Sequence, residues 1–307
     1  MINCITMSCL GKLGRFGNQV FQYTFLRTYA QRYNLDYQAS RWEGQRLFGL
    51  VDPSIAGRHL PRYNERADKT IHNSAANYQD AWYPPIIPEG REIAGYDYRG
   101  YCQFHMKYYS PDRKFIQQLF VPTLEVQQRM RPALDSLYQT DGTLIGFHMR
   151  RGDTGRAIFY ITPNEWYLAW LEKHWDRFYH PRLFITTEEP TDVEAFSKYN
   201  PVIASELLSL KTDRYSFYNY LPYDLRNPTP EAMDWFPDWY FLTQCNVLLF
   251  GESTFSFSAA MMSAKLQECW QSRLSTQEFE LIDPWGCQPL MREHLDEYPE
   301  VAGTRRG

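Results

Sequence analysis

The segment HMRRGD, from His148 to Asp153, concentrates groups that could bind or stabilise an anion. Two adjacent arginines stand between a histidine and an aspartate, and the run TLIGF directly before them is typical of a buried strand. One interpretation is a surface ion pair. The other is a ligand with phosphate groups, since guanidinium groups clamp phosphate oxygens with paired hydrogen bonds. The other polar segments of the chain bear on this choice.

Three further polar segments follow predicted strands: GRFGNQ (Gly14 to Gln19), TTEE (Thr186 to Glu189) and GESTFS (Gly251 to Ser256). In a parallel α/β sheet, ligands bind beyond the carboxyl ends of the strands, where helix N-termini also point. Backbone N–H groups at a helix start, together with the hydroxyls of Ser253, Thr254 and Ser256, make an anion cradle. With Arg150 or Arg151 added, these residues describe a diphosphate site.

Each of these signals also has a structural alternative that the sequence leaves open. His148 can equally be a core histidine with satisfied hydrogen bonds, and Arg151 can hold Asp153 in an ion pair. The spacing Gly-x-x-Gly-x-x-Gly at residues 11, 14 and 17 lacks the tighter dinucleotide fingerprint, and by itself it indicates a tight strand-to-helix turn.

Missing motifs narrow the chemistry. The sequence has no Asp-x-Asp pair, no phosphate loop of the Gly-x-x-x-x-Gly-Lys-Ser/Thr type and no His-Glu-x-x-His. We therefore expect no metal and no other cofactor. Without a metal ion, the negative charge of a departing diphosphate must be neutralised by arginine. The two arginines of HMRRGD can fill this role.

Length and composition set the frame for these motifs. The 307 residues suffice for two domains, and the net charge of −4 without a long basic run does not favour nucleic acid as a partner. No apolar stretch of about 18 residues and no export signal are visible, so we expect a soluble, cytoplasmic protein with reduced cysteines. The aromatic content of 17% suits stacking on sugar rings, although aromatic residues are also ordinary core material.

Hydrophobic periodicity predicts the elements that must position the motifs. Strands are expected over residues 2–8, 143–149, 182–187, 201–205, 246–250 and 279–282, and helices over 21–29, 123–139 (bent or interrupted near Pro132), 162–175, 191–199, 237–245 and 255–270. Thr162, Pro163 and Glu165 match an N-cap, a first-turn proline and a capping box. Residues 40–100 are poorly periodic, so loops and short elements are expected there. Strands alternating with helices indicate parallel βαβ units, and TDGT (140–143) is a plausible domain junction.

Three segments in this order resemble the α-1,2-fucosyltransferase family, glycosyltransferases that use GDP-fucose: GRFGNQVFQY, IGFHMRRGDT and ESTFSFSAA. TTEEPTDVEAF and DWYFLTQCNVLLFGESTFS also look like segments of related fucosyltransferases. The resemblance covers roughly residues 9 to 262. Glu188 and Glu189 depart from the aspartates usual at their place, and FSFSAA departs from the aromatic pair that often follows the serine.

The resemblance implies an α/β fold of the GT-B type, two facing Rossmann-like domains with mainly parallel sheets. Residues 1–140 would form the acceptor-side domain and residues 141–307 the domain that binds GDP-fucose. The implied reaction moves L-fucose from GDP-β-L-fucose to a glycan hydroxyl, with O2 of a terminal β-galactoside as the family expectation. It inverts the anomeric centre to an α-1,2 linkage and needs no metal.

Functional residues are carried over at the matching positions. Catalytic roles fall on Arg150, Asn18 and Asp153. The donor-binding set is His148, Arg150, Arg151, Asp238, Ser253, Thr254, Phe255 and Ser256. The acceptor-binding set is Gly17, Asn18, Gln19, Tyr101 and His105. Within these sets, Arg150 is expected on the β-phosphate, Asp238 on guanine N1 and N2, and Asn18 at the reaction centre. Asp238 can instead only stabilise its helix N-terminus.

Other functions stay open at this point. GRFGNQ also resembles protein O-fucosyltransferases, and a different nucleotide-sugar transferase of the same fold fits the phosphate motifs equally well. RGD at Arg151 to Asp153 is in principle an adhesion tripeptide, which would make the protein a binding module. Its place at the end of a predicted strand argues against display.

Overall fold

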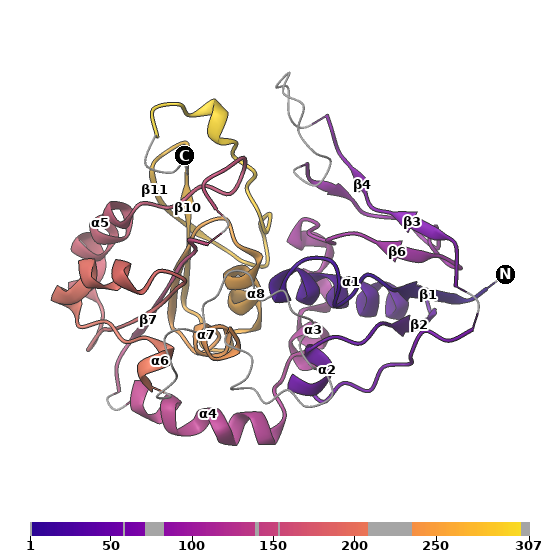
Figure 1. Ribbon diagram of the computed structural model, residues 1–307, viewed down its shortest axis with the longest axis horizontal. Helices are drawn as coiled ribbons and strands as arrows, with labels where there is room; N and C mark the ends of the chain where they lie inside the picture. The colour runs from indigo at the N-terminus through magenta and orange to yellow at the C-terminus, as the bar shows by residue number, and fades with distance from the viewer. Residues whose placement is uncertain are drawn as a thin grey trace. The chain divides into compact units, whose positions relative to one another are not determined.

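The computed structural model of the chain describes residues 2–57, 59–70, 83–138, 141–152, 154–207 and 235–301 (Figure 1). The chain forms two compact units. Unit 1 comprises Met1–Thr123 and Trp285–Arg292, and unit 2 comprises Leu124–Pro284 and Glu293–Gly307. Both units are α/β in character, so the expected fold class is confirmed.

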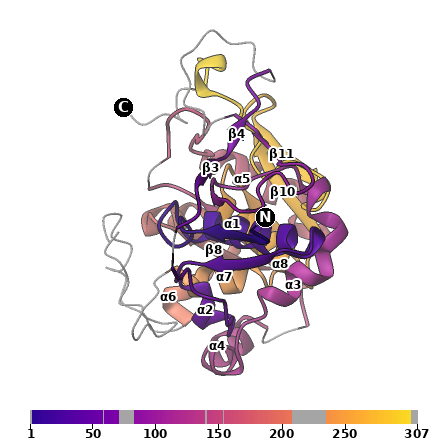
Figure 2. The same ribbon diagram turned by 90° about the vertical axis from the view of Figure 1, so that its right-hand side faces the viewer.

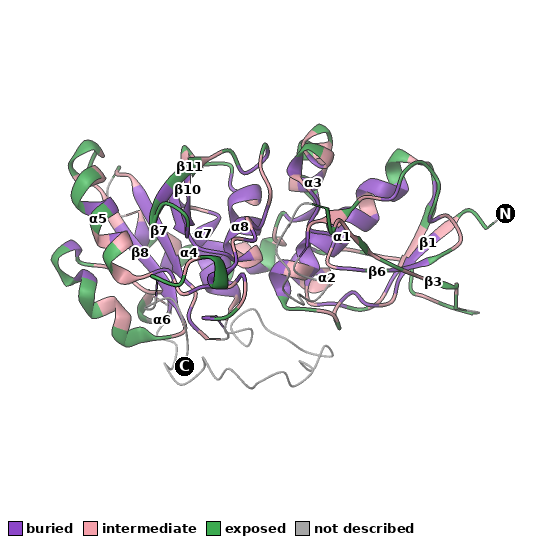
Figure 3. Cartoon of the chain, turned by 90° about the horizontal axis from the view of Figure 1, so that it is seen from above, coloured by how far each residue is buried: buried purple, intermediate pink, exposed green. Residues whose placement is uncertain are grey.

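Unit 1 is built on a four-stranded parallel sheet with the order β2-β1-β6-β3. Its elements are β1 (Cys4–Met7), α1 (Phe16–Arg32), β2 (Asp36–Ala39), α2 (Gly44–Leu47), β3 (Arg62–Asn64), β4 (Arg66–Ala67), β5 (Pro85–Ile86), β6 (Asp97–Arg99), the 3-10 turns η2 (Met106–Tyr108) and η3 (Ser110–Asp112), and α3 (Arg113–Leu119). Most of α1 is buried, as Figure 3 shows. The first expected strand and helix are thus confirmed, and the region from 40 to 100 holds only short elements.

The strand order of unit 1 brings two loops to one edge. Strand β1 has β2 on one side and β6 on the other, so the loops that follow β1 and β6 leave the sheet at neighbouring positions. Asp97 fastens this junction, because its carboxylate accepts hydrogen bonds from Thr6 Oγ1 at 2.8 Å, Ser8 N at 2.8 Å and Ser8 Oγ at 2.6 Å. Residues 8–15 and 100–105 therefore lie at the carboxyl edge of the central strands.

Unit 2 contains a five-stranded sheet with the order β11-β10-β9-β7-β8, parallel except for β11. Strands β7, β10 and β11 are labelled in Figure 1, and β8 is labelled in Figure 2. Its elements are α4 (Leu124–Leu137), β7 (Leu144–Met149), α5 (Asn164–His174), the 3-10 turn η4 (Trp175–Arg177), β8 (Arg182–Thr187), the 3-10 segment η5 (Pro190–Tyr199), α6 (Ala204–Leu207), α7 (Phe236–Leu242), β9 (Val247–Phe250), α8 (Thr254–Met262), β10 (Glu268–Arg273), β11 (Glu278–Ile282) and η8 (Leu295–Glu297). The alternation of strands and helices expected for this half is confirmed.

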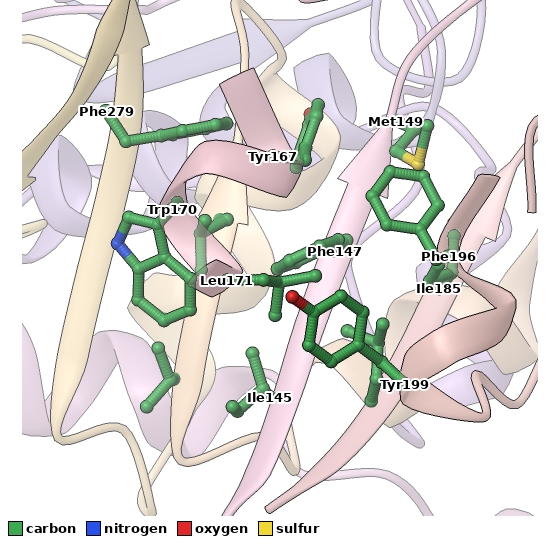
Figure 4. Packing of buried hydrophobic residues seen from close by; sticks show 13 residues of the cluster. Ile145, Phe147, Met149, Tyr167, Trp170, Leu171, Ile185, Phe196, Tyr199 and Phe279 are labelled. Atoms are coloured by element: carbon green, nitrogen blue, oxygen red, sulfur yellow. The ribbon is translucent and has the colours of Figure 1, made fainter. Parts of the chain in front are cut away.

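Strand β7 is buried on both faces, and its side chains alternate between them. Ile145, Phe147 and Met149 pack into an aromatic core with α5 and η5 (Figure 4). Gly146 and His148 point to the opposite face. A Cβ at Gly146 would lie 2.5 Å from Cys245 Sγ, and His148 contacts α8. The aromatic cluster NEWYLAWLEKHW is core material in large part, since Tyr167, Trp170 and Leu171 belong to this cluster.

Several local predictions were wrong in detail. The helix expected over 255–270 ends at Met262, and its last residues instead form β10, which pairs in parallel with β9. The strand expected over 201–205 is a single bridge between Phe184 and Val202. Helix α4 is continuous through Pro132. The predicted capping box is absent from the start of α5, because the Thr162 hydroxyl lies 2.9 Å from Ser272 Oγ and Pro163 stands at the N-cap.

The division into units also differs from the expected boundary at 140. Helix α4 belongs to unit 2, where Arg182 of β8 donates to the carbonyls of Ser136 and Leu137 at its end. Residues 285–292 return to unit 1, where Cys287 O accepts from Met106 N at 3.0 Å and Arg113 lies 5.3 Å from the ring centre of Trp285. Neither the contacts of α4 with Arg182 nor those of residues 285–292 with unit 1 can be predicted from local sequence, since they join residues far apart in the chain.

Candidate active site

The polar segments of unit 2 meet where the strand order reverses. The chain runs from β7 to β8 on one side and then crosses to β9 on the other side of β7. Loops that leave the carboxyl ends of β7 and β9 therefore diverge at a topological switch point, the usual ligand position in such sheets. His148 Nδ1 lies 3.0 Å from Ser256 Oγ, and Arg150 Nη1 donates to Glu252 O at 2.9 Å. HMRRGD and GESTFS are thus in direct contact.

His148 is held as a neutral ring. Only 6% of the residue is exposed, its ring centre lies 5.2 Å from that of Phe255, and its backbone carbonyl accepts from Tyr167 Oη at 3.0 Å. Burial, together with the smaller effect of the positive charges of Arg150 and Arg151, lowers the pKa of His148 to about 3. An uncharged imidazole leaves the arginines as the cations of this site.

Arg150 is half-buried and is held from two directions. One N–H donates to the carbonyl of Glu252, in the loop before α8, and the guanidinium carbon lies 4.7 Å from the ring centre of Phe159. These contacts hold the plane of the guanidinium. A cation held in this way is suited to an anionic ligand.

Arg151 has a different surrounding and serves the scaffold. Its exposed fraction is 5%, and its guanidinium donates to the Asp192 carboxylate, to Thr162 O at 3.0 Å and to Asn164 Oδ1 at 2.6 Å. Its backbone N–H donates to Glu188 Oε2 at 2.8 Å. Arg151 therefore ties the loop after β7 to η5 and to the start of α5. Such burial also removes the adhesion-tripeptide alternative, which requires an exposed arginine.

The two acidic residues of TTEE have different surroundings in the structure. Glu188 fixes the backbone of Arg151, whereas Glu189 is exposed. Asp153, expected as a catalytic residue and as a partner of Arg151, lies outside the residues that the structure describes. Asp192, in the first turn of η5, pairs with Arg151.

Helix α8 begins at the same switch point. Ser253 is its N-cap, Thr254 its first residue, and Ser253 and Ser256 are buried while Thr254 and Phe255 are half-buried. The helix has nine residues, so its N-terminal N–H groups carry the positive end of an established dipole. All four residues of the predicted motif therefore stand at the end of β9, beside His148 and Arg150.

Asp238 lies on α7, which packs against α8. Its exposed fraction is 3%, and it stands in the first turn of the helix after Pro237. The neighbouring Trp239 donates to Ser258 Oγ of α8 at 3.0 Å, and Trp235 lies 6.5 Å from Phe255 between ring centres. The structure thus places Asp238 on a helix that is fastened to the phosphate-side motif.

In unit 1 the expected acceptor residues gather at the carboxyl edge of its sheet. Gly17, Asn18 and Gln19 lie in the first turn of α1, and Asn18 Oδ1 accepts from Gln103 Nε2 at 2.7 Å. Tyr101 is half-buried and donates its backbone N–H to Glu65. His105 has a local structural role, because its Nδ1 accepts from Lys107 N at 3.0 Å at the start of η2.

Three residues of this edge were not found from the sequence: Glu65, Gln103 and Arg292. Glu65 accepts from Tyr101 N at 3.2 Å and Cys102 N at 2.7 Å, and burial raises its pKa to about 7. Arg292 donates to Gln103 Oε1 at 3.3 Å. No motif signals them, since Glu65 lies in the poorly periodic region and Arg292 is 189 positions from Gln103.

Two other kinds of feature are absent from the described part of the chain. Within it, no three His, Cys, Asp or Glu side chains are grouped as metal ligands. None of its helices is long and apolar enough to cross a bilayer.

The arrangement defines an α/β protein of two Rossmann-like units, each with a polar cluster at the carboxyl edge of its sheet. Solved structures place this fold in the GT-B class. The chain is similar to the Bradyrhizobium fucosyltransferase NodZ, an α-1,6-fucosyltransferase co-crystallised with GDP, with 13% identity, a TM-score of 0.54 and coverage of 92% of this chain and 99% of that one. It is also similar to a variant of Arabidopsis thaliana FUT1 in complex with GDP, with 12% identity, a TM-score of 0.52 and coverage of 94% and 73%.

At these identities the likeness is one of fold. The chain matches no protein-family model and no curated protein sequence. What the protein does must therefore be argued from its own residues.

Proposed function

We propose that the protein is a glycosyltransferase that moves L-fucose from GDP-β-L-fucose to a hydroxyl of an acceptor glycan. The observation that carries this proposal is the junction of HMRRGD and GESTFS at the switch point of β7 and β9, where His148 contacts Ser256 and Arg150 contacts the Glu252 carbonyl. The fold of solved fucosyltransferases, two of them with GDP, supports the same reading.

The chemistry follows from the charge that develops during transfer. As the bond between fucose C1 and the diphosphate oxygen lengthens, positive charge grows on the sugar ring and negative charge on GDP. Arg150 and the N–H groups and hydroxyls from Ser253 to Ser256 stabilise the departing diphosphate. Because the Arg150 guanidinium is already held in place by Glu252 O and Phe159, little reorganisation of this group is needed when the charge appears.

The nucleotide side of the site is assigned to His148, Phe255 and Asp238. A neutral His148 does not compete with Arg150 for phosphate, and its ring with that of Phe255 offers an aromatic surface. A buried carboxylate at Asp238 accepts from guanine N1 and N2, a pattern that adenine does not present. Arg151 supports the loop rather than the ligand.

The acceptor and the linkage are the finer part of the proposal. We assign the acceptor to the edge of unit 1 that carries Asn18 and Tyr101, and the product to an α-1,2 linkage on O2 of a terminal β-galactoside, formed with inversion. The motif resemblance supports this linkage, whereas NodZ is an α-1,6-fucosyltransferase. We further propose that no metal takes part and that the enzyme works in the cytoplasm. Protein O-fucosylation and transfer from another nucleotide sugar are the alternatives.

Donor binding and linkage can be tested in sequence. Thermal melts with GDP-fucose, GDP-mannose and UDP-galactose rank the donors, and we expect the largest stabilisation from GDP-fucose. Transfer to lactose is then measured with radiolabelled donor, and the product linkage is assigned by NMR. Stabilisation by UDP-galactose alone would refute the donor assignment, and a fucosylated product linked through O6 would correct only the linkage.

A further inference from the structure

An unbroken chain of side-chain hydrogen bonds leads from Arg292 to Asn18 within unit 1. Arg292 Nη2 donates to Gln103 Oε1 at 3.3 Å, and Gln103 Nε2 donates to Asn18 Oδ1 at 2.7 Å. The three residues are contributed by the segment 285–292, by the loop after β6 and by the first turn of α1. They are 189 and 85 positions apart in sequence, so only the fold joins them.

The polarity of this chain is fixed at one end. A guanidinium has N–H donors and no acceptor, so the atom of Gln103 that faces Arg292 must be its oxygen. The amide nitrogen of Gln103 then faces Asn18, and Asn18 must meet it with its own oxygen. The Asn18 Nδ2 group is consequently turned to the opposite side of the amide, as a donor.

The surroundings hold this arrangement firmly. Gln103 is 6% exposed and Arg292 is 3% exposed, so neither can exchange its partner for water. Arg292 adopts a φ of +60°, a backbone conformation that is unfavourable for a side chain of this size, and its Nη1 donates to Leu290 O at 3.3 Å. The nearby Glu65 offsets part of its charge, as the effect of Arg292 on the pKa of Glu65 shows.

The other side of the Asn18 amide is also constrained. A Cβ at Gly14 would lie 2.4 Å from Asn18 Nδ2, and Gly14 has a φ of +75° that glycine tolerates. The glycine turn before α1 therefore packs directly against the amide that Gln103 orients. The GRFGNQ segment therefore contacts this amide in addition to forming the tight turn before α1.

We propose that Gln103, oriented by Arg292, is a positioning residue that presents the Asn18 amide N–H to a substrate oxygen during fucosyl transfer. The inference rests on the proposed function and adds residues that no motif indicated. An amide N–H donates but takes no proton at neutral pH, so Asn18 orients the substrate and does not act as the base. The returning segment 285–292 is then part of the acceptor-side machinery, although it follows the last strand of unit 2.

A double-mutant cycle tests whether Gln103 acts through Asn18. Single-turnover transfer to lactose is compared for wild type, Asn18→Ala, Gln103→Met and the double variant, together with GDP affinity and thermal melts. We expect each single variant to lower transfer about tenfold or more, since small misplacements of a positioning group have effects of this size. The double variant should be no slower than Asn18→Ala, and GDP affinity should change less than twofold.

A second variant covers the case in which Gln103→Met does not fold. Gln103→Glu keeps the volume and the bond to Arg292 but cannot donate to Asn18, so the Asn18 amide loses this support and transfer should fall as in Gln103→Met. Gln118→Glu, an exposed residue of α3 in the same unit, is the matched control and should transfer normally.

The outcomes separate this inference from the proposed function. Losses that multiply in the double variant, or normal transfer by Gln103→Glu, would overturn the positioning role while leaving the enzyme a fucosyltransferase. A wild-type protein that neither binds GDP-fucose nor slowly hydrolyses it would overturn both.

Discussion

The two arginines of HMRRGD should respond in opposite ways to lysine. Arg151 is buried, and its guanidinium donates to Asp192 of η5, to Thr162 O before α5 and to Asn164 Oδ1 of α5. Arg150 is half-buried, donates to Glu252 O and packs on Phe159. A lysine has three donors on one nitrogen atom and cannot reach acceptors on both sides of a planar fork. Arg151→Lys is therefore a test of the scaffold, and Arg150→Lys a test of catalysis.

The magnitude for Arg151 follows from the acceptors that lose their donor. If the new ammonium group satisfies Asp192, then Thr162 O and Asn164 Oδ1 are left without it, at about 1–3 kcal/mol each. We expect a loss of about 3–5 kcal/mol in the free energy of unfolding of unit 2. For a domain of this size, this corresponds to a melting temperature lower by roughly 10 °C. Arg150→Lys should lower it by no more than about 3 °C.

Turnover should show the reverse order. Losing one preorganised donor to a developing oxyanion typically lowers turnover by about 10²–10³. We expect Arg150→Lys to reduce both transfer and slow hydrolysis of GDP-fucose by at least about a hundredfold while it still binds GDP weakly. Arg151→Lys, assayed well below its melting temperature, should lose less than about tenfold.

The assay is single-turnover transfer beside thermal melts for both variants, with Arg156→Lys as the control. Arg156 is exposed on the same loop and should tolerate lysine in both measurements. Near-normal turnover by Arg150→Lys would show that this motif is scaffolding throughout. Equal melting temperatures for the two variants would refute the structural role of Arg151.

Three further predictions concern the recognition of guanine, the need for a metal and the pH dependence of stability. Asp238→Asn turns an acceptor into a donor facing guanine donors, so GDP affinity measured by calorimetry should fall about tenfold or more; an unchanged affinity would remove Asp238 from the site. Transfer should survive EDTA, and activity restored only by magnesium or manganese would show that a metal is required. Burial raises the pKa of Glu65 from 4.5 to about 7, so its stabilising contribution is complete below pH 4.5 and is lost as pH rises through 7. Relative to Glu65→Gln, wild type should lose up to about 3 kcal/mol of stability across this window in urea titrations, and parallel pH profiles would contradict the assignment.

Much of unit 2 follows from local sequence. The run at β7 is apolar at almost every position because both faces of a central parallel strand are covered. Pro237 marks the start of α7, and the glycine and serine residues after β9 mark the turn into α8. Once the strands are recognised as parallel, their carboxyl ends share one edge, so the candidate donor site is predictable as a set of segments.

The predicted boundaries of helices and strands were wrong where the local preference of the sequence disagrees with hydrogen bonding to a distant residue. The sequence of residues 268–270 continues the helical pattern. These residues nevertheless belong to β10, because the open edge of β9 offers backbone hydrogen bonds that a last helical turn lacks. Thr162 has the sequence of an N-cap, but its hydroxyl is better placed on Ser272 than on its own helix. The partner that decides the outcome lies more than 20 positions away for residues 268–270 and more than 100 positions away for Thr162.

The sequence by itself indicated the residues of the candidate donor site, which are the arginine pair and the hydroxyl motif, and the fold class that brings them to one edge. Only the tertiary structure decided their roles. It paired Arg151 with Asp192, left Arg150 half-buried beside Glu252, and joined Asn18 to Arg292 through Gln103. Local sequence encodes backbone preference and hydrophobic pattern, whereas the direction of a hydrogen bond between distant residues depends on strand order and on which donors and acceptors burial leaves without water.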